Sequence, residues 1–179
     1  MQFGPVTIRI SAGYLAEQQR LHQQPAYGSR GYNWGYVVAG IARIEECRSI
    51  LDYGAGKGTL TRTLKLANHQ VQAYDPAVSE FAHPPMPADL VACVDVLEHI
   101  EPECLDGVLD HLAKLTKKIL FVAISMRQAK RWLSDGRNAH LLIQSGPWWR
   151  EQLEQRGFTV RRVWPHSETN EWVAMLERT

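Results

Sequence analysis

The chain has 179 residues, of which 45% are hydrophobic and 22% are charged, and its formal net charge at pH 7 is +1. This length suits one domain with a sizeable core. The balanced charge does not indicate a nucleic-acid partner, though it does not exclude one, and it gives no argument for a membrane surface. No apolar run reaches membrane-spanning length, and the N-terminus lacks the apolar stretch of a signal peptide. Three cysteines without close-pair metal spacing, Cys47, Cys93 and Cys104, indicate a reduced cytoplasmic protein.

Residues 1–35 are expected to form an N-terminal helix and a lid-like segment. Residues 1–10 alternate between apolar and other side chains, which is typical of a short edge strand or an ordered arm. A helix is predicted over residues 11–23. Residues 24–35 mix proline and glycines with aromatic side chains, so they form either a lid over a flat ligand or a packed surface loop. We expect a lid that includes Trp34.

The next stretch predicts a helix, a buried strand, a glycine turn and a second helix. Residues 36–47 predict an amphipathic helix with Val37, Ile41 and Ile44 on one face, and residues 48–53 predict a strand. The turn is Asp52-Tyr53-Gly54-Ala55-Gly56-Lys57-Gly58, and a helix is expected over residues 59–68. Alternating glycines let the backbone adopt positive φ and pass close to a ligand.

Two common glycine-loop motifs do not fit this turn. A phosphate-cradling loop needs a glycine five residues before Gly56, where Leu51 stands. A dinucleotide fingerprint needs its third glycine where Thr59 stands. What remains is an acid two residues before three alternating glycines, and this acid suits a cationic ligand group better than a pyrophosphate.

A second strand is predicted over residues 71–75. It ends in Asp75, which lies 23 residues after Asp52, where a ribose-binding carboxylate is expected in adenosine sites. The alternative for Asp75 is a turn acid before Pro76. Four prolines within residues 76–88 argue against a regular helix and strand there, because proline fixes φ and lacks an N–H donor.

The C-terminal half alternates strands and helices. Near-continuous apolar runs over residues 90–96 and 117–124 predict parallel strands that are covered on both faces. The remaining expectations are a helix over 103–114, a short helix over 127–133, a polar loop over 134–145 that contains His140, a helix over 146–157, and a hairpin of 158–164 with 171–176 around residues 166–170.

The stretch Leu51-Asp52-Tyr53-Gly54-Ala55-Gly56-Lys57-Gly58-Thr59-Leu60 resembles the first motif of class I S-adenosylmethionine-dependent methyltransferases. The strand that ends at Asp75, the strand and exit over residues 89–100, and the strand over 119–124 agree in order and spacing. The resemblance implies a single doubly wound, Rossmann-like α/β domain over residues 36–179. Its sheet would be mainly parallel with an antiparallel last strand. The prolines of residues 76–88 depart from the family pattern, and they predict that the third strand is missing or reduced.

The resemblance also implies where ligands bind. S-adenosylmethionine is expected at the carboxyl ends of the strands, bound by residues of the glycine turn and of the next two strand ends: Asp52, Tyr53, Gly54, Ala55, Gly56, Tyr74, Asp75, Pro76, Asp95 and Val96. His99 follows the strand nearest to the methyl group and is the candidate general base, and His140 is the second catalytic candidate. The alternative for His99 is a cap or brace of the following helix.

A metal site is the further hypothesis. Asp95, Glu98 and His99 have spacing i, i+3, i+4, and His140 is expected at the same rim, so two carboxylates and two imidazoles could hold Mg²⁺ or Mn²⁺. The set resembles the metal site of small-RNA 3′-terminal ribose methyltransferases, in which the first position is Glu. The alternative is a hydrogen-bonded rim without metal.

The sequence therefore predicts a methyltransferase that acts on a hydroxyl of a small molecule, sugar or nucleotide. The alternatives are a cofactor-binding accessory or sensor protein without transfer activity, and a metal-dependent RNA ribose methyltransferase.

Overall fold

The computed structural model describes residues 9–164 and 170–179. Most of the alternating segment expected over residues 1–10, and nearly all of the hairpin turn expected over 166–170, lie outside the described residues. No helix in the described ranges is long and apolar enough to cross a membrane.

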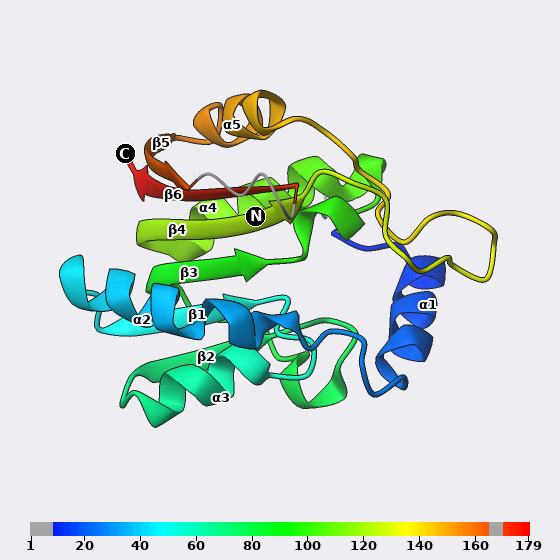
Figure 1. The fold of residues 1–179 in the computed structure, drawn as a ribbon, viewed down its shortest axis with the longest axis horizontal. Helices are drawn as coiled ribbons and strands as arrows, with labels where there is room; N and C mark the ends of the chain where they lie inside the picture. Colours follow the sequence, from blue (N-terminus) through cyan, green and yellow to red (C-terminus); the bar gives the residue numbers. More distant parts are fainter. Residues whose placement is uncertain (1–8, 165–169) are drawn as a thin grey trace, which may run out of the picture.

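One six-stranded sheet organises the fold, in the order β2-β1-β3-β4-β6-β5 (Figure 1). The strands are β1 (Ser49–Tyr53), β2 (Gln70–Tyr74), β3 (Ala88–Val94), β4 (Thr116–Ser125), β5 (Phe158–Trp164) and β6 (Glu171–Arg178). β1 pairs in parallel with β2 and β3, and β3 with β4, whereas β6 is antiparallel to both of its neighbours. The predicted mainly parallel sheet with an antiparallel last strand is confirmed.

The segment between β2 and β3 adds no strand, which confirms the prediction from its prolines. Its only regular element is the short 3-10 turn η2 (Ser79–Phe81). β2 therefore forms the edge of the sheet. The segment is tied to this edge by the Gln72 side chain, whose Oε1 accepts from the N–H of Met86 at 3.0 Å. A side chain thus supplies a bond that a paired strand would make through its backbone.

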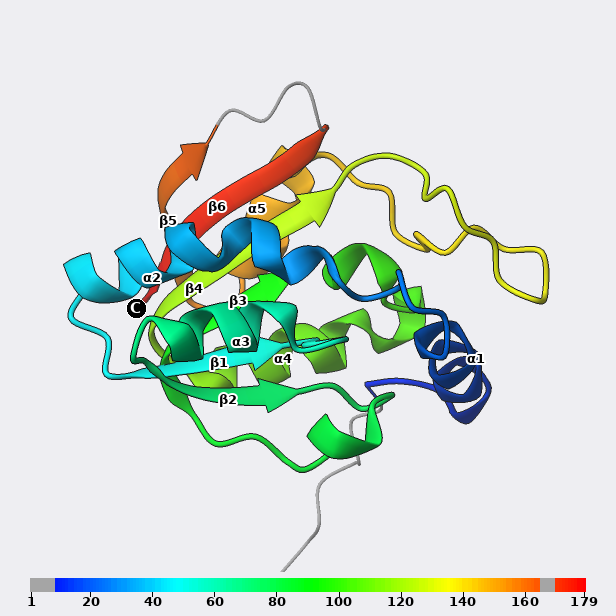
Figure 2. The ribbon, with the colours of Figure 1, turned by 60° about the horizontal axis from the view of Figure 1, so that its bottom comes forward.

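Two pairs of helices cover the two faces of the sheet (Figures 1 and 2). The helices are α2 (Gly35–Ile44) and α3 (Thr59–Leu66) on one face, and α4 (Leu105–Leu115) and α5 (Gly146–Glu154) on the other. Side chains alternate along each strand. In β1, Ile50 packs with α2 and α3, while Leu51 packs with α4 and α5. The doubly wound α/β fold is confirmed.

The first helix, α1 (Ala12–His22), lies beyond the carboxyl ends of the parallel strands (Figures 1 and 2). Ser11 caps it, accepting from the N–H of Tyr14. The helix packs on the 126–145 loop through a small separate core of Tyr14, Leu21, Leu133 and Ala139. Glu17 of α1 also accepts from the N–H and hydroxyl of Ser134. The predicted helix over residues 11–23 is confirmed, and it packs on the 126–145 loop.

Three local expectations were wrong. Ile44 is 73% exposed, because α2 turns Val38, Ile41 and Ala42 toward the sheet instead. Residues 127–133 form no helix; they are irregular, and Trp132 bridges to Asn138. The Asn138 amide side chain satisfies both the N–H and the C=O of Ala129, which competes with helical bonding. Trp34 packs on Phe121 of the sheet, with ring centroids 5.5 Å apart, and is half-buried against the core.

Candidate functional site

The turn after β1 requires glycine. Gly54, Gly56 and Gly58 have φ of 77°, 51° and 64°, in the region that side chains disfavour. A Cβ at Gly54 would lie 2.3 Å from Val96 Cγ2. The turn bends back onto β2, since the N–H groups of Gly54 and Ala55 both donate to the Tyr74 carbonyl. The carboxyl ends of β1, β2 and β3 therefore meet at one point.

Asp52 lies beneath this turn and supports it. Its buried carboxylate accepts from the N–H of Thr61 at 3.0 Å and from the Thr61 hydroxyl at 2.7 Å. Burial raises the pKa of Asp52 to about 6, and the hydrogen bonds from Thr61 oppose that shift. These contacts attach β1 to the first turn of α3. Asp52 and Ala55 do not line the adjacent cavity.

A cavity of about 750 Å³ opens at the carboxyl ends of the strands. It lies between the strand ends, the N-terminal segment (residues 9–34) and the 126–145 loop. Ten of the sequence-predicted residues line it: Tyr53, Gly54, Gly56, Tyr74, Asp75, Pro76, Asp95, Val96, His99 and His140. Glu98, like Asp52 and Ala55, lies behind this lining. Open α/β sheets collect ligands at this position.

Asp75 is held in place by backbone donors. Its Oδ2 accepts from the N–H of Gly56 and its Oδ1 from the N–H of Ala77, both at 2.9 Å. His22 of α1 places Nε2 at 3.8 Å from Oδ2. Burial lowers the pKa of His22, so this imidazole is neutral at pH 7. The carboxylate is fixed with lone pairs still available toward the cavity.

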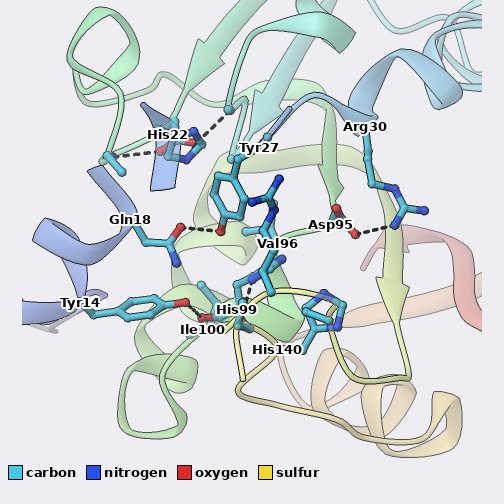
Figure 3. Close-up of a pocket in the computed structure, with 18 of the residues that line it drawn as sticks. Tyr14, Gln18, His22, Tyr27, Arg30, Asp95, Val96, His99, Ile100 and His140 are labelled. Carbon is cyan, nitrogen blue, oxygen red and sulfur yellow. Dashed lines mark hydrogen bonds and ion pairs between the residues drawn. The ribbon is translucent and has the colours of Figure 1, made fainter. Parts of the chain in front are cut away.

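The N-terminal segment closes tightly over the glycine turn. The Gly28 carbonyl accepts from the N–H of Lys57 at 2.8 Å. A Cβ on Gly56 would lie 2.5 Å from that carbonyl oxygen. Further along the cavity wall, the Tyr27 hydroxyl donates to Gln18 Oε1 at 2.8 Å (Figure 3).

Several lining residues were missed by the sequence reasoning: His22, Tyr27, Arg30, Arg127, Lys130 and Arg131. The glycines and aromatic residues of residues 24–35 signalled the region of Tyr27 and Arg30 only.

His99 and His140 lie together on one side of the cavity (Figure 3). Their rings are nearly perpendicular, with centroids 4.7 Å apart. Nδ1 of His99 is 2.8 Å from the Ala139 carbonyl, and Nδ1 of His140 is 2.6 Å from the Arg127 carbonyl. A carbonyl only accepts, so each Nδ1 carries a proton, and Nε2 holds the lone pair of a neutral ring. Burial lowers the pKa of His99 to about 4, so its imidazole is neutral at pH 7.

Two carboxylates complete this cluster. One ligand atom from each of Asp95, Glu98, His99 and His140 lies within 4.8 Å of the others. Glu98 Oε1 accepts from the N–H of Ser125 at 2.8 Å, whereas its buried Oε2 has no partner among the described residues. Burial, and next the Asp95 carboxylate, raise the pKa of Glu98 well above its usual range. Arg30 lies 3.8 Å from Asp95 (Figure 3). Arg30 also pairs with Glu171.

Comparison with known proteins agrees with this architecture. A family model described as a methyltransferase domain matches residues 27–163. No curated protein sequence matches the chain.

Solved structures of similar fold include the magnesium protoporphyrin IX methyltransferase of Synechocystis PCC 6803 with bound S-adenosylmethionine. It is 17% identical with a TM-score of 0.62, over 94% of this chain and 92% of that one.

A Burkholderia thailandensis 1,6-didemethyltoxoflavin-N1-methyltransferase with bound S-adenosylhomocysteine is 18% identical with a TM-score of 0.66. The match covers 98% of this chain and 94% of that one. The mitomycin 7-O-methyltransferase is 17% identical with a TM-score of 0.68, over 91% of this chain and 61% of that one. The resemblance to class I S-adenosylmethionine-dependent methyltransferases is confirmed, and the chain belongs to the methyltransferase domain family.

Proposed function

We propose that the protein binds S-adenosylmethionine in this cavity and transfers its methyl group to a hydroxyl of a small molecule, sugar or nucleotide. Asp75 would accept from the ribose hydroxyls, and the backbone at Gly54 and Gly56 would allow the methionine part to approach closely. Several solved structures of this fold are named with bound S-adenosylmethionine or S-adenosylhomocysteine, which supports this assignment.

The observation that carries the hydroxyl assignment is the state of His99. Its Nδ1–H donates to the Ala139 carbonyl, which leaves Nε2 unprotonated on the cavity side. A hydroxyl loses its proton as it attacks the methyl group, so a neutral imidazole within reach can accept that proton. The sulfonium donor is already reactive, and positioning the acceptor in line supplies much of the remaining rate enhancement. His140, in contact with His99, would orient the acceptor.

A second candidate is metal-assisted transfer, and the unpartnered Glu98 Oε2 favours it. A buried carboxyl oxygen without a hydrogen-bond partner costs stability, which a cation bound in exchange for the Glu98 proton would relieve. Both histidines donate Nδ1–H to a carbonyl, as metal-ligating histidines do. The donors Asp95, Glu98, His99 and His140 would hold the ion, and oxygen and imidazole donors suit Mg²⁺ or Mn²⁺. A bound cation would lower the pKa of a coordinated hydroxyl. His99 would then be a ligand, which excludes its role as free base.

The cofactor assignment is tested by calorimetry with S-adenosylhomocysteine. Asp75→Ala removes the carboxylate that Gly56 and Ala77 hold in place, and we expect binding to weaken at least tenfold, by about 1.4 kcal/mol or more. Lys65→Ala, an exposed change at the far end of α3, is the control. Tight NADH or ATP binding without S-adenosylhomocysteine binding would refute the assignment.

The activity is tested by transfer from radiolabelled S-adenosylmethionine into metabolite, glycan and RNA pools. If His99 is the base, transfer continues in EDTA and His99→Ala abolishes it. If the cluster holds a metal, EDTA stops transfer, Mn²⁺ or Mg²⁺ restores it, and His140→Ala is as damaging as His99→Ala. Intact cofactor binding with no transfer into any pool would favour the accessory or sensor role.

A further inference from the structure

The cavity wall carries an excess of positive charge. Among the described residues, its cationic side chains are Arg9, Arg30, Arg127, Lys130 and Arg131, and its carboxylates are Asp75 and Asp95. The whole chain has a net charge of only +1, so this excess is local. A locally cationic concave surface raises the concentration of anions at its mouth.

The two carboxylates do not neutralise this excess evenly. Asp95 is beside Arg30, and Asp75 lies against the glycine turn. Arg131 contacts the Gln24 side chain and lies over the Tyr27 ring. The side chains of Arg127 and Lys130 are exposed and make no hydrogen bond or ion pair with any described residue. Their charges are therefore available to a ligand.

Backbone contacts fix the stretch that carries Arg127 and Lys130 relative to the His99 and His140 rings. The Arg127 carbonyl accepts from Nδ1 of His140, whose ring contacts His99. The Asn138 side chain holds the N–H and C=O of Ala129, between Arg127 and Lys130. Arg127 and Lys130 therefore extend from a braced stretch beside the histidines, in the wall of the cavity.

We propose that the methyl acceptor is a small anionic molecule whose phosphate or carboxylate group binds Arg127 and Lys130 while its hydroxyl lies at His99. This inference rests on the proposed function for the identity of the reaction. Arginine forms paired hydrogen bonds to such groups, and lysine adds a point charge. A cationic acceptor would be repelled at the same place. The anion thus sets which end of the acceptor points toward the donor methyl group.

The test uses inorganic pyrophosphate as a charge probe, titrated by calorimetry into the protein saturated with S-adenosylhomocysteine. EDTA is present throughout, so that no metal at the acidic cluster can bind the probe. We expect the double variant R127Q/K130Q to raise the dissociation constant about tenfold, and the difference to shrink in high salt. The control R43Q/K65Q removes the same two residue types from exposed positions at the far ends of α2 and α3, and should leave binding unchanged.

Equal losses in both double variants, or no pyrophosphate binding by the wild-type protein, would overturn the proposal. Binding of a ribo-oligonucleotide but not of pyrophosphate would also overturn it, in favour of an RNA acceptor. If S-adenosylhomocysteine itself fails to bind, the proposed function fails, and pyrophosphate titration of the free protein still tests the anion site separately.

Discussion

Replacing Gly56 with alanine should separate the N-terminal segment from the glycine turn. Gly56 has φ of 51°, and an alanine held in that left-handed region costs about 1–2 kcal/mol. Its Cβ would lie 2.5 Å from the Gly28 carbonyl oxygen and 2.9 Å from Gly28 Cα, so the neighbouring backbone must move. That movement removes the bond from the N–H of Lys57 to the Gly28 carbonyl, which contributes about 1 kcal/mol.

The free energy of unfolding should therefore fall by about 2–3 kcal/mol in Gly56→Ala. Urea unfolding followed by circular dichroism measures this change. Gly136→Ala is the matched control, because Gly136 has φ of 84° and a Cβ there would meet no described residue within 4 Å beyond its chain neighbours. The control should lose only the backbone contribution of about 1–2 kcal/mol.

A second effect follows from the bond that Gly56 N–H donates to Asp75. Displacing the turn moves this donor, so S-adenosylhomocysteine binding should weaken in Gly56→Ala and remain normal in Gly136→Ala. Calorimetry well below the unfolding temperature separates binding from stability. If the two variants lose equal stability and bind equally well, the close contact between Gly28 and Gly56 does not hold the N-terminal segment in place, and the reasoning is refuted.

Two further predictions concern stability alone. Burial raises the pKa of Asp52 from 3.8 to about 6, so the folded state retains a proton that the unfolded chain releases. The stability that this proton contributes is therefore lost as pH rises from about 4 to about 6. In Asp52→Asn, the free energy of unfolding should no longer fall by this part, on the order of 3 kcal/mol, between pH 4 and pH 7, as measured by urea titration. If the free energy of unfolding changes with pH as much in the variant as in the wild-type protein, the raised pKa is contradicted. Gly40→Ala, within α2 and with open space around its Cβ, should stabilise the protein by about 0.5–1 kcal/mol in the same assay, and a loss of stability would show that the site is more crowded than the structure indicates.

The sequence by itself determined the elements whose causes are local. The three glycines after β1 adopt positive φ, as their spacing indicated. Prolines between β2 and β3 prevented a strand, because each fixes φ and lacks a donor wherever it is placed. The apolar runs of β3 and β4 became parallel strands covered on both faces, and Asp75 directly follows β2 at the cavity wall. These results depend on residues close together in the chain.

The tertiary structure alone decided which side chains meet. Asp52 points to Thr61 beneath the turn, because α3 docks there, and no spacing in the sequence specifies that direction. Trp34 was expected in a lid but packs on Phe121, a strand residue far along the chain. α1 and the 126–145 loop share a small core that neither could form alone, and the loop then holds His140 against His99. Periodicity reports which face of an element is apolar, but the partner of that face depends on how distant elements pack together.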